Sequence, residues 1–255
     1  MQTLNIRAVQ SDIIWENPKG NLDNLTALLK NAQKDELVVL PEMFATGFSM
    51  NTEKTAQSMN GEIVSWMKES SEDKMVCGTV AIEDDGKYYN RFIACYRGEI
   101  TCKYDKRHLF SYAGEDRHYT PGKDVTVFEF QGWKIKPLIC YDLRFPVWCR
   151  NKEEADLMLF CANWPEARIQ AWNALLAARA IENQCFVLGV NRVGLDGKQK
   201  QHNGQTQLCD PLGSQINPCG DSEAVFEYSV QREVLQSIRI EYPFLRDSDL
   251  FTVLV

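Results

Sequence analysis

Three segments of the chain place a charged or reactive side chain directly after an apolar run. Glu42 follows residues 37–40 and a proline, Lys106 lies in the polar stretch 104–108, and Cys140 closes the apolar run 137–139. A cysteine thiolate is a nucleophile, a positioned carboxylate can accept a proton, and a cation can stabilise an oxygen that becomes negative. These residue types are therefore suited to covalent catalysis through a cysteine.

Each segment also has an ordinary structural explanation when it is taken alone. A glutamate after a strand is commonly a solvated loop residue, and residues 104–108 fit a basic surface loop. A single cysteine at the end of an apolar run is commonly inert core. In favour of a site, open α/β folds place their ligands at the carboxyl ends of buried strands.

Taken together, in the order Glu42, Lys106, Cys140, the segments resemble the nitrilase superfamily of carbon–nitrogen hydrolases, whose catalytic set is a Glu-Lys-Cys triad. The lysine precedes x-His-Leu-Phe and the cysteine precedes Tyr-Asp-Leu-Arg-Phe-Pro. The resemblance covers nearly the whole chain and includes residues 114–115, 119–122, 162–165 and 178–184. It implies an α/β fold, a four-layer α-β-β-α sandwich, whose subunits pair through their outer helices as a homodimer.

Within that superfamily, residues 45–50 and 140–148 look like the omega-amidase branch. Those enzymes hydrolyse the terminal amide of 2-oxoglutaramate or 2-oxosuccinamate to a dicarboxylate and ammonia through a cysteine thioester. The resemblance implies that Glu42 moves the proton of Cys140, which requires an environment suited to that task. Lys106 and the backbone N–H of Tyr141 would stabilise the developing oxyanion. Glu115 matches a second family glutamate that positions Lys106 and the substrate.

Arg144 is the candidate for binding the carboxylate at the far end of such a substrate, because a guanidinium can bind a carboxylate through two parallel hydrogen bonds. The alternative is a structural ion pair with Asp142 or another acid. Phe48 and Trp164 are candidate pocket walls, with plain core packing as the alternative. The expected ligand is a small amide.

Other charged and titratable residues are assigned to the scaffold. Arg179 and Glu182 lie three apart on an expected helix and can pair, which indicates scaffold or subunit interface. His108, His118 and His202 permit a papain-like Cys–His alternative, but no motif pairs any of them with Cys140. We interpret His108 as a residue that braces its loop.

Composition narrows the classes of protein. The 28 Lys and Arg against 35 Asp and Glu give a formal net charge of -7, which argues against a nucleic-acid surface. No secretory signal and no apolar stretch of about 20 residues is visible, so we expect a cytoplasmic protein without a membrane span. The nine cysteines contain no Cys-x-x-Cys pair and are expected to be mostly free thiols. No metal or cofactor is implied.

The elements needed to position these residues can be predicted from hydrophobic patterning. Strands are expected at 4–9, 37–40, 75–82, 91–96, 125–130, 135–141, 155–162, 185–193 and 224–228. Helices are expected to begin at Asn17-Pro18, around 63–67, and over 166–183 and 231–239. No linker divides residues 1–255, which indicates one domain, with 244–255 as an apolar tail packed on the domain or on a partner subunit.

Some alternatives stay open at this stage. A true nitrilase, an N-carbamoyl amine hydrolase or an aliphatic amide hydrolase would use the same triad, and a catalytically silent binding protein of this fold is a weaker option. Residues 202–206 depart from the Gly-x-Ser that family members often carry there, and we expect this to alter a strand near the pocket rim and to leave the triad untouched.

Overall fold

The computed structural model describes residues 2–216 and 220–253, and within these residues the strands form two six-stranded sheets and a two-stranded ribbon. The first sheet has the order β14-β1-β2-β3-β4-β5 and the second has the order β13-β12-β9-β8-β7-β6. The strands of the first sheet are β1 Thr3–Gln10, β2 Leu37–Val39, β3 Met75–Asp84, β4 Lys87–Tyr96, β5 Glu99–Asp105 and β14 Ala224–Gln231. Those of the second are β6 Phe128–Phe130, β7 Trp133–Ile139, β8 Leu157–Ala162, β9 Phe186–Asn191, β12 Gln207–Cys209 and β13 Gln215–Ile216. The ribbon pairs β10 Val193–Leu195 with β11 Gln201–Asn203.

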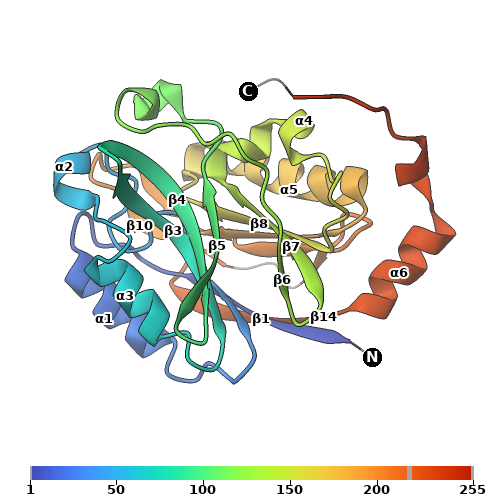
Figure 1. Cartoon of the computed structure of the whole chain (residues 1–255), viewed down its shortest axis with the longest axis horizontal. Coiled ribbons are helices and arrows are strands. Elements are labelled where there is room, and N and C mark those ends of the chain that lie inside the picture. The colour runs from blue at the N-terminus through green and yellow to red at the C-terminus, as the bar shows by residue number, and fades with distance from the viewer. Residues whose placement is uncertain (1, 217–219, 254–255) are drawn as a thin grey trace.

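Helices cover the outer faces of both sheets (Figure 1). On the first sheet lie α1 Pro18–Leu28 and α3 Glu62–Glu69, with the short α2 Thr52–Thr55 nearby. On the second sheet lie α4 Pro146–Cys149 and α5 Ile169–Asn183, and α6 Arg232–Glu241 follows β14 at the end of the molecule. Short 3-10 turns are η1 Ser111–Ala113, η2 Glu115–Arg117, η3 Cys140–Arg144, η4 Glu166–Arg168 and η5 Phe244–Asp247. The arrangement confirms the predicted four-layer α-β-β-α sandwich.

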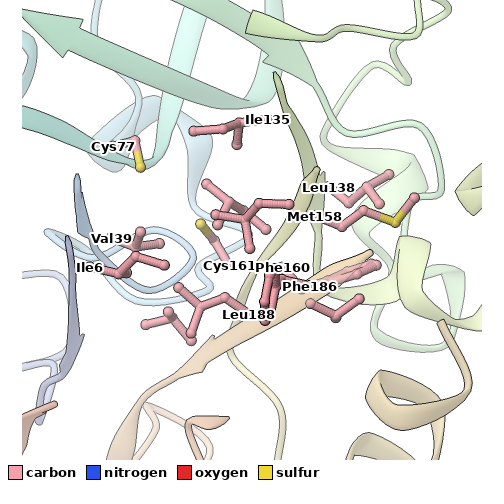
Figure 2. Packing of buried hydrophobic residues seen from close by; sticks show 14 of the residues in the cluster. Ile6, Val39, Cys77, Ile135, Leu138, Met158, Phe160, Cys161, Phe186 and Leu188 are labelled. Carbon is pink, nitrogen blue, oxygen red and sulfur yellow. The ribbon is translucent and has the colours of Figure 1, made fainter. Parts of the chain in front are cut away.

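The strands read as almost continuously apolar because both of their faces are covered. In β2, Leu37 and Val39 point into the space between the sheets, whereas Val38 packs under α1 and α3. Successive side chains of a strand point to opposite faces, so a buried central strand needs an apolar residue at every position. Figure 2 shows the intersheet core, where Val39 and Cys77 of the first sheet face Cys161 and Leu188 of the second.

Parallel strands bring the ends of several predicted segments to one edge of the sandwich. β1, β2 and β3 run parallel to one another in the first sheet, as do β7, β8 and β9 in the second. The segments that carry Glu42 and Cys140 leave the carboxyl ends of β2 and β7, and Lys106 directly follows β5. The site residues therefore come from strand ends of both sheets.

Most predicted elements are confirmed, and their differences from prediction have local causes. The predicted strand 135–141 is wrong at its end, because β7 stops at Ile139 and Cys140 has a positive φ of 40° that starts η3. The predicted strand 125–130 begins only at Phe128, and the predicted helix 166–183 opens with the 3-10 turn η4. β5 and the short strands β10 to β13 were not predicted: β5 alternates polar with apolar residues, and β10 to β13 have only two or three residues each, too few to show a pattern.

The C-terminal tail contacts the domain only in part. The carbonyl of Phe251 accepts a hydrogen bond from Lys152, and Val253 packs against the core, whereas Leu250 is 99% exposed. Residues 254–255 of the predicted tail lie outside the described residues. None of the helices within residues 2–216 and 220–253 is long and apolar enough to cross a bilayer.

We predict that Leu159→Ala, in the centre of β8, lowers the free energy of unfolding by about 2–5 kcal/mol, because the side chain is fully buried and the mutation leaves a cavity. Leu212→Ala is the matched control: Leu212 is 54% exposed, so its loss should change the free energy by less than about 0.5 kcal/mol. Urea denaturation of both variants measures the difference, and equal losses would contradict the assigned core.

Candidate active site

Cys140 lies at the point where the buried strand β7 turns abruptly into η3. Its φ of 40° is in the left-handed region, which costs a non-glycine residue about 1–3 kcal/mol unless its surroundings enforce it. Among the eight cysteines that the structure describes, Cys140 is the one that is not buried, and it lines a pocket. The strained turn thus presents a single thiol to that pocket.

Asp142 holds this turn in place from two residues further along. One carboxylate oxygen, Oδ2, accepts hydrogen bonds from the backbone N–H of Ile139 at 3.0 Å and from the Tyr104 hydroxyl at 2.7 Å. The other, Oδ1, accepts from the backbone N–H of His108 at 2.9 Å and lies 2.8 Å from Nδ1 of the same histidine. The buried carboxylate therefore ties the cysteine turn to the loop that carries Lys106.

Glu42 leaves β2 through Pro41 and is fully buried. Its Oε1 accepts hydrogen bonds from Lys106 Nζ and from Asn90 Nδ2, both at 2.8 Å. Its Oε2 accepts the backbone N–H of Asn163 at 2.9 Å, and that N–H also interacts with the Cys140 thiol. Since Asn163 directly follows β8, this contact joins the two sheets at the site.

Lys106 directly follows β5, and its ammonium lies between two carboxylates. Nζ is 2.8 Å from Glu42 Oε1 and 3.0 Å and 2.9 Å from the two oxygens of Glu115. Glu115 opens the turn η2 after Gly114 and also accepts the backbone N–H of Phe110 at 2.5 Å. All three charged side chains are buried, so the predicted grouping of Glu42, Lys106 and Glu115 is present as one ionic cluster.

The charges of this cluster shift several pKa values. Burial acts to lower the pKa of Lys106, but attraction by Glu115 and Glu42 outweighs it and holds that pKa above its usual range. Burial raises the pKa of Glu115, against the opposing effect of Lys106. Burial and the nearby charge of Glu42 hold the pKa of the Cys140 thiol well above its ordinary value, with Lys106 opposing. The resting cysteine is therefore a thiol at neutral pH.

The pocket in front of Cys140 has aromatic walls and a cationic rim. Phe48 and Trp164 line it, with the Phe48 ring centroid 4.9 Å from Lys106 Nζ. Five Lys and Arg side chains and a single acid, Asp196, are among the described residues of the lining. The cations in addition to Lys106 are Arg144, Arg168, Lys198 and Lys200. A pocket of this charge favours an anionic ligand.

Arg144 takes part in no ion pair with any carboxylate of the described residues. Asp142 is bound instead to Tyr104, His108 and Ile139, so the alternative in which it pairs with Arg144 is wrong. The guanidinium lies 4.9 Å over the ring of Trp164 at the pocket wall. Its hydrogen-bonding capacity is thereby available to a ligand.

The residues assigned to the scaffold support the site from outside. Arg179 pairs with Glu182 at 3.0 Å, as predicted, and its other nitrogen donates to the carbonyl of Leu143 at 2.7 Å. This contact connects α5 to the cysteine turn. His108 stacks on Phe145 with ring centroids 3.7 Å apart, which confirms its role as a brace.

The Cys–His alternative finds no support in the geometry. Within the part of the chain that the structure describes, none of the three histidines hydrogen bonds to Cys140. His202 does line the pocket from β11, which places the unusual segment 202–206 at the rim as expected. Burial and the charge of Arg192 lower the pKa of His202 to about 4, so it is neutral at pH 7.

Sequence reasoning missed three residues that hold the cluster together: Asn90, Asn163 and the brace Asp142. Asn90 lies within β4 and looks like an ordinary outward-facing position. A usable signal was that Asn163 directly follows, and Asp142 closely follows, the end of an apolar strand. The backbone N–H of Tyr141, predicted as a donor, carries no hydrogen bond in the described structure, and the Tyr141 side chain lines the pocket.

Comparison with known proteins identifies the family to which this two-sheet sandwich belongs. The chain belongs to the carbon-nitrogen hydrolase family, whose family model matches residues 5–240.

Relatives within this family are similar over their whole length. An omega-amidase of Yersinia enterocolitica is 41% identical over 100% of both chains, and a 2-oxoglutaramate amidase of Bacillus subtilis is 31% identical over 95% of this chain and 96% of its own. A crystal structure from Xanthomonas campestris, a CN-hydrolase superfamily protein with an arsenic adduct in the active site, is 39% identical and superposes with a TM-score of 0.96. The match covers 99% of this chain and 100% of that one.

We predict that iodoacetamide modifies Cys140 at least about tenfold faster than the other seven described cysteines, because it alone is exposed to a pocket beside a proton acceptor. Burial also raises the pKa of Cys95 to about 11 and that of Cys102 to about 12, and neither of these thiols lines the pocket. Peptide mass spectrometry after brief labelling measures each site. Uniform labelling would contradict the assignment of Cys140 as the accessible thiol.

Proposed function

We propose that this chain is an omega-amidase: it hydrolyses the terminal amide of a small 2-oxo dicarboxylate monoamide, such as 2-oxoglutaramate or 2-oxosuccinamate, to the dicarboxylate and ammonia. The observation that carries the proposal is the convergence of Glu42, Lys106 and Cys140 at a pocket in whose wall Arg144 lies without an ion pair among the described residues. The names of the relatives support the substrate class.

In the proposed first half-reaction, the sulfur of Cys140 attacks the amide carbon while Glu42 accepts the thiol proton. A base is needed because the pKa of this thiol lies well above its ordinary value. Oε2 of Glu42 suits the task, because it accepts one hydrogen bond, from the backbone N–H of Asn163, whereas Oε1 accepts two, from Lys106 and Asn90. The carbonyl oxygen becomes negative and is stabilised by Lys106 and by the N–H of Tyr141, each such donor contributing roughly 3–4 kcal/mol.

Collapse of this tetrahedral intermediate breaks the carbon–nitrogen bond and leaves a thioester on Cys140. Glu42 returns its proton to the departing nitrogen, which leaves as ammonia. Water then attacks the thioester carbon while Glu42 accepts a proton from it, and the second collapse releases the carboxylic acid and returns the proton to the sulfur. Each proton is thus moved by the one carboxylate, and Lys106 keeps its charge throughout because its pKa is raised.

The substrate's charge supports the same class. Arg144 lies over Trp164 inside the pocket, and Arg168, Lys198 and Lys200 line the same space. On a chain with a net charge of -7, this local excess of cations favours a carboxylate-bearing amide over a neutral one. A small pocket with aromatic walls suits a short substrate.

The substrate class is tested by ammonia release from matched compounds. We predict turnover of 2-oxoglutaramate and 2-oxosuccinamate with a kcat/KM at least about 100-fold above that for propionamide, N-carbamoyl amines and aliphatic nitriles, because only the first two carry the carboxylate. The control is Cys140→Ala, which should release no ammonia above background. Hydrolysis of N-carbamoyl amines alone would transfer the chain to another branch of the family, and no hydrolysis of any compound would favour a binding protein.

We predict that Arg144→Leu lowers kcat/KM for 2-oxoglutaramate about 100-fold, the effect of losing about 3 kcal/mol of charged hydrogen bonding. Its kcat/KM for propionamide, which has no carboxylate, should change by less than about threefold. Arg150→Leu is a matched control, since Arg150 binds the carbonyl of Glu182 away from the pocket. Equal losses on both substrates would remove Arg144 from carboxylate recognition.

A further inference from the structure

We propose that Asn90 is a positioning residue of the site: its side-chain amide holds Glu42 and Glu115 together around the single ammonium of Lys106. The inference rests on the proposed function, because Glu42 is the base of that reaction. It concerns a residue that touches neither the thiol nor the pocket and that acts through the two carboxylates.

The geometry of Asn90 matches this role atom by atom. Its Nδ2 donates to Glu42 Oε1 at 2.8 Å and to Glu115 Oε1 at 3.1 Å, so each of its two N–H bonds has one carboxylate as its acceptor. Its backbone carbonyl accepts the backbone N–H of Lys106 at 3.0 Å. Asn90 is fully buried. Through these three hydrogen bonds it connects Glu42, Lys106 and Glu115, which lie in different segments of the chain.

The charges explain why such a residue is needed. Glu42 and Glu115 share one ammonium, so the ionised cluster has an excess of one negative charge among side chains that are buried. Two carboxylates this close favour protonation of one of them unless donors stabilise both charges. Asn90 supplies two N–H donors without adding a charge, whereas a second lysine would leave Glu42 too weak a base.

The amide oxygen of Asn90 indicates that the contacts of Nδ2 to the carboxylates determine the position of this side chain. In the described part of the chain, Asn90 Oδ1 is buried without a hydrogen-bond partner. Asn151, a buried amide near the amino-terminal end of β8, instead uses both ends: Nδ2 donates to the carbonyl of Ala155 and Oδ1 accepts its N–H. An unpaired buried acceptor is costly, so the gain at Nδ2 has to offset it.

The titratable groups that face the two carboxylates come from three neighbouring segments. They are Lys106 after β5, the thiol of Cys140 at the start of η3, and the hydroxyl of Tyr119, whose pKa is raised by burial and by the charge of Glu115. Lys106 and the Tyr119 hydroxyl stay protonated in the neutral range, and so does the thiol. The fall of kcat/KM on the acid side of a pH profile therefore follows the protonation of the carboxylates.

The test is the pH dependence of kcat/KM for Asn90→Leu. Removing the two N–H donors favours the protonated form of the carboxylates and so raises the pKa of the cluster. The acid limb of the profile, where kcat/KM falls as the pH is lowered, should therefore move to higher pH by about one unit. We expect kcat at neutral pH to fall about 10- to 100-fold while KM changes less than about threefold, because substrate contacts are kept. Asn90→Ser, which keeps one hydroxyl donor, should shift the limb by an intermediate amount.

Asn151→Leu is the matched control for loss of a buried amide. It should lower the thermal midpoint while leaving the pH limb where it is in the wild type. An unshifted limb in both Asn90 variants, once circular dichroism shows them to be folded, would overturn the proposal. So would a shift in Asn151→Leu equal to that in Asn90→Leu.

A second measurement separates failure of this proposal from failure of the proposed function. The rate of Cys140 alkylation by iodoacetamide, followed against pH in the wild type and the Asn90 variants, needs no substrate. The same upward shift should appear there, because Glu42 accepts the thiol proton. If the wild type hydrolyses no omega-amide but the pH dependence of alkylation still shifts in the Asn90 variants, the proposed function is wrong and the role of Asn90 stands. If the wild type hydrolyses omega-amides but the pH dependence of alkylation does not shift in the variants, the proposed function stands and the role of Asn90 is wrong.

Discussion

The ammonium of Lys106 lies out of water between the carboxylates of Glu42 and Glu115, and the rest of the site is arranged around this contact. Removing an ion from water costs several kcal/mol even after relaxation, and attraction between partners only roughly offsets that cost. Two carboxylates around one ammonium therefore do not stabilise the fold better than packed apolar residues would. Such a cluster is explained by chemistry, as is common for buried groups with shifted pKa values at the edge of a pocket.

The sandwich makes this cluster possible by bringing strand ends from both sheets to one edge. Glu42 and Lys106 follow strands of the first sheet, whereas Cys140 and Asn163 follow strands of the second. The N–H of Asn163 on Glu42 Oε2 and the contacts of Asp142 to Tyr104 and His108 cross between the two sheets. The intersheet core fixes the separation of these ends, because its side chains are close-packed and tolerate little movement. The rigid intersheet core thus fixes the positions of the site residues that follow the strand ends.

The sequence was sufficient for the strands with two covered faces and for the segments that carry the chemistry. Continuous apolar runs such as residues 37–40 have no other stable place than the interior, and the order of Glu42, Lys106 and Cys140 led to the family. It was insufficient for Asn90 and Asp142, because a polar residue in a strand or turn has the same local pattern whether it faces water or a buried partner. Only the pairing of β4 with its neighbours places Asn90 beside Glu42, and that pairing is not local. The turn at Cys140 was misplaced for a similar reason, since a positive φ at a cysteine depends on contacts such as that of Asp142 with Ile139.

The account depends most on a covalent bond forming between the substrate and the sulfur of Cys140. The direct measurement is peptide mass spectrometry of the protein after it has been mixed with 2-oxoglutaramate and quenched in acid within the first turnovers. We expect the peptide that contains Cys140 to carry the acyl group of the substrate as a thioester, with one ammonia released for each acyl group bound. Turnover without any acyl group on Cys140, or an acyl group on a different residue, would contradict the mechanism.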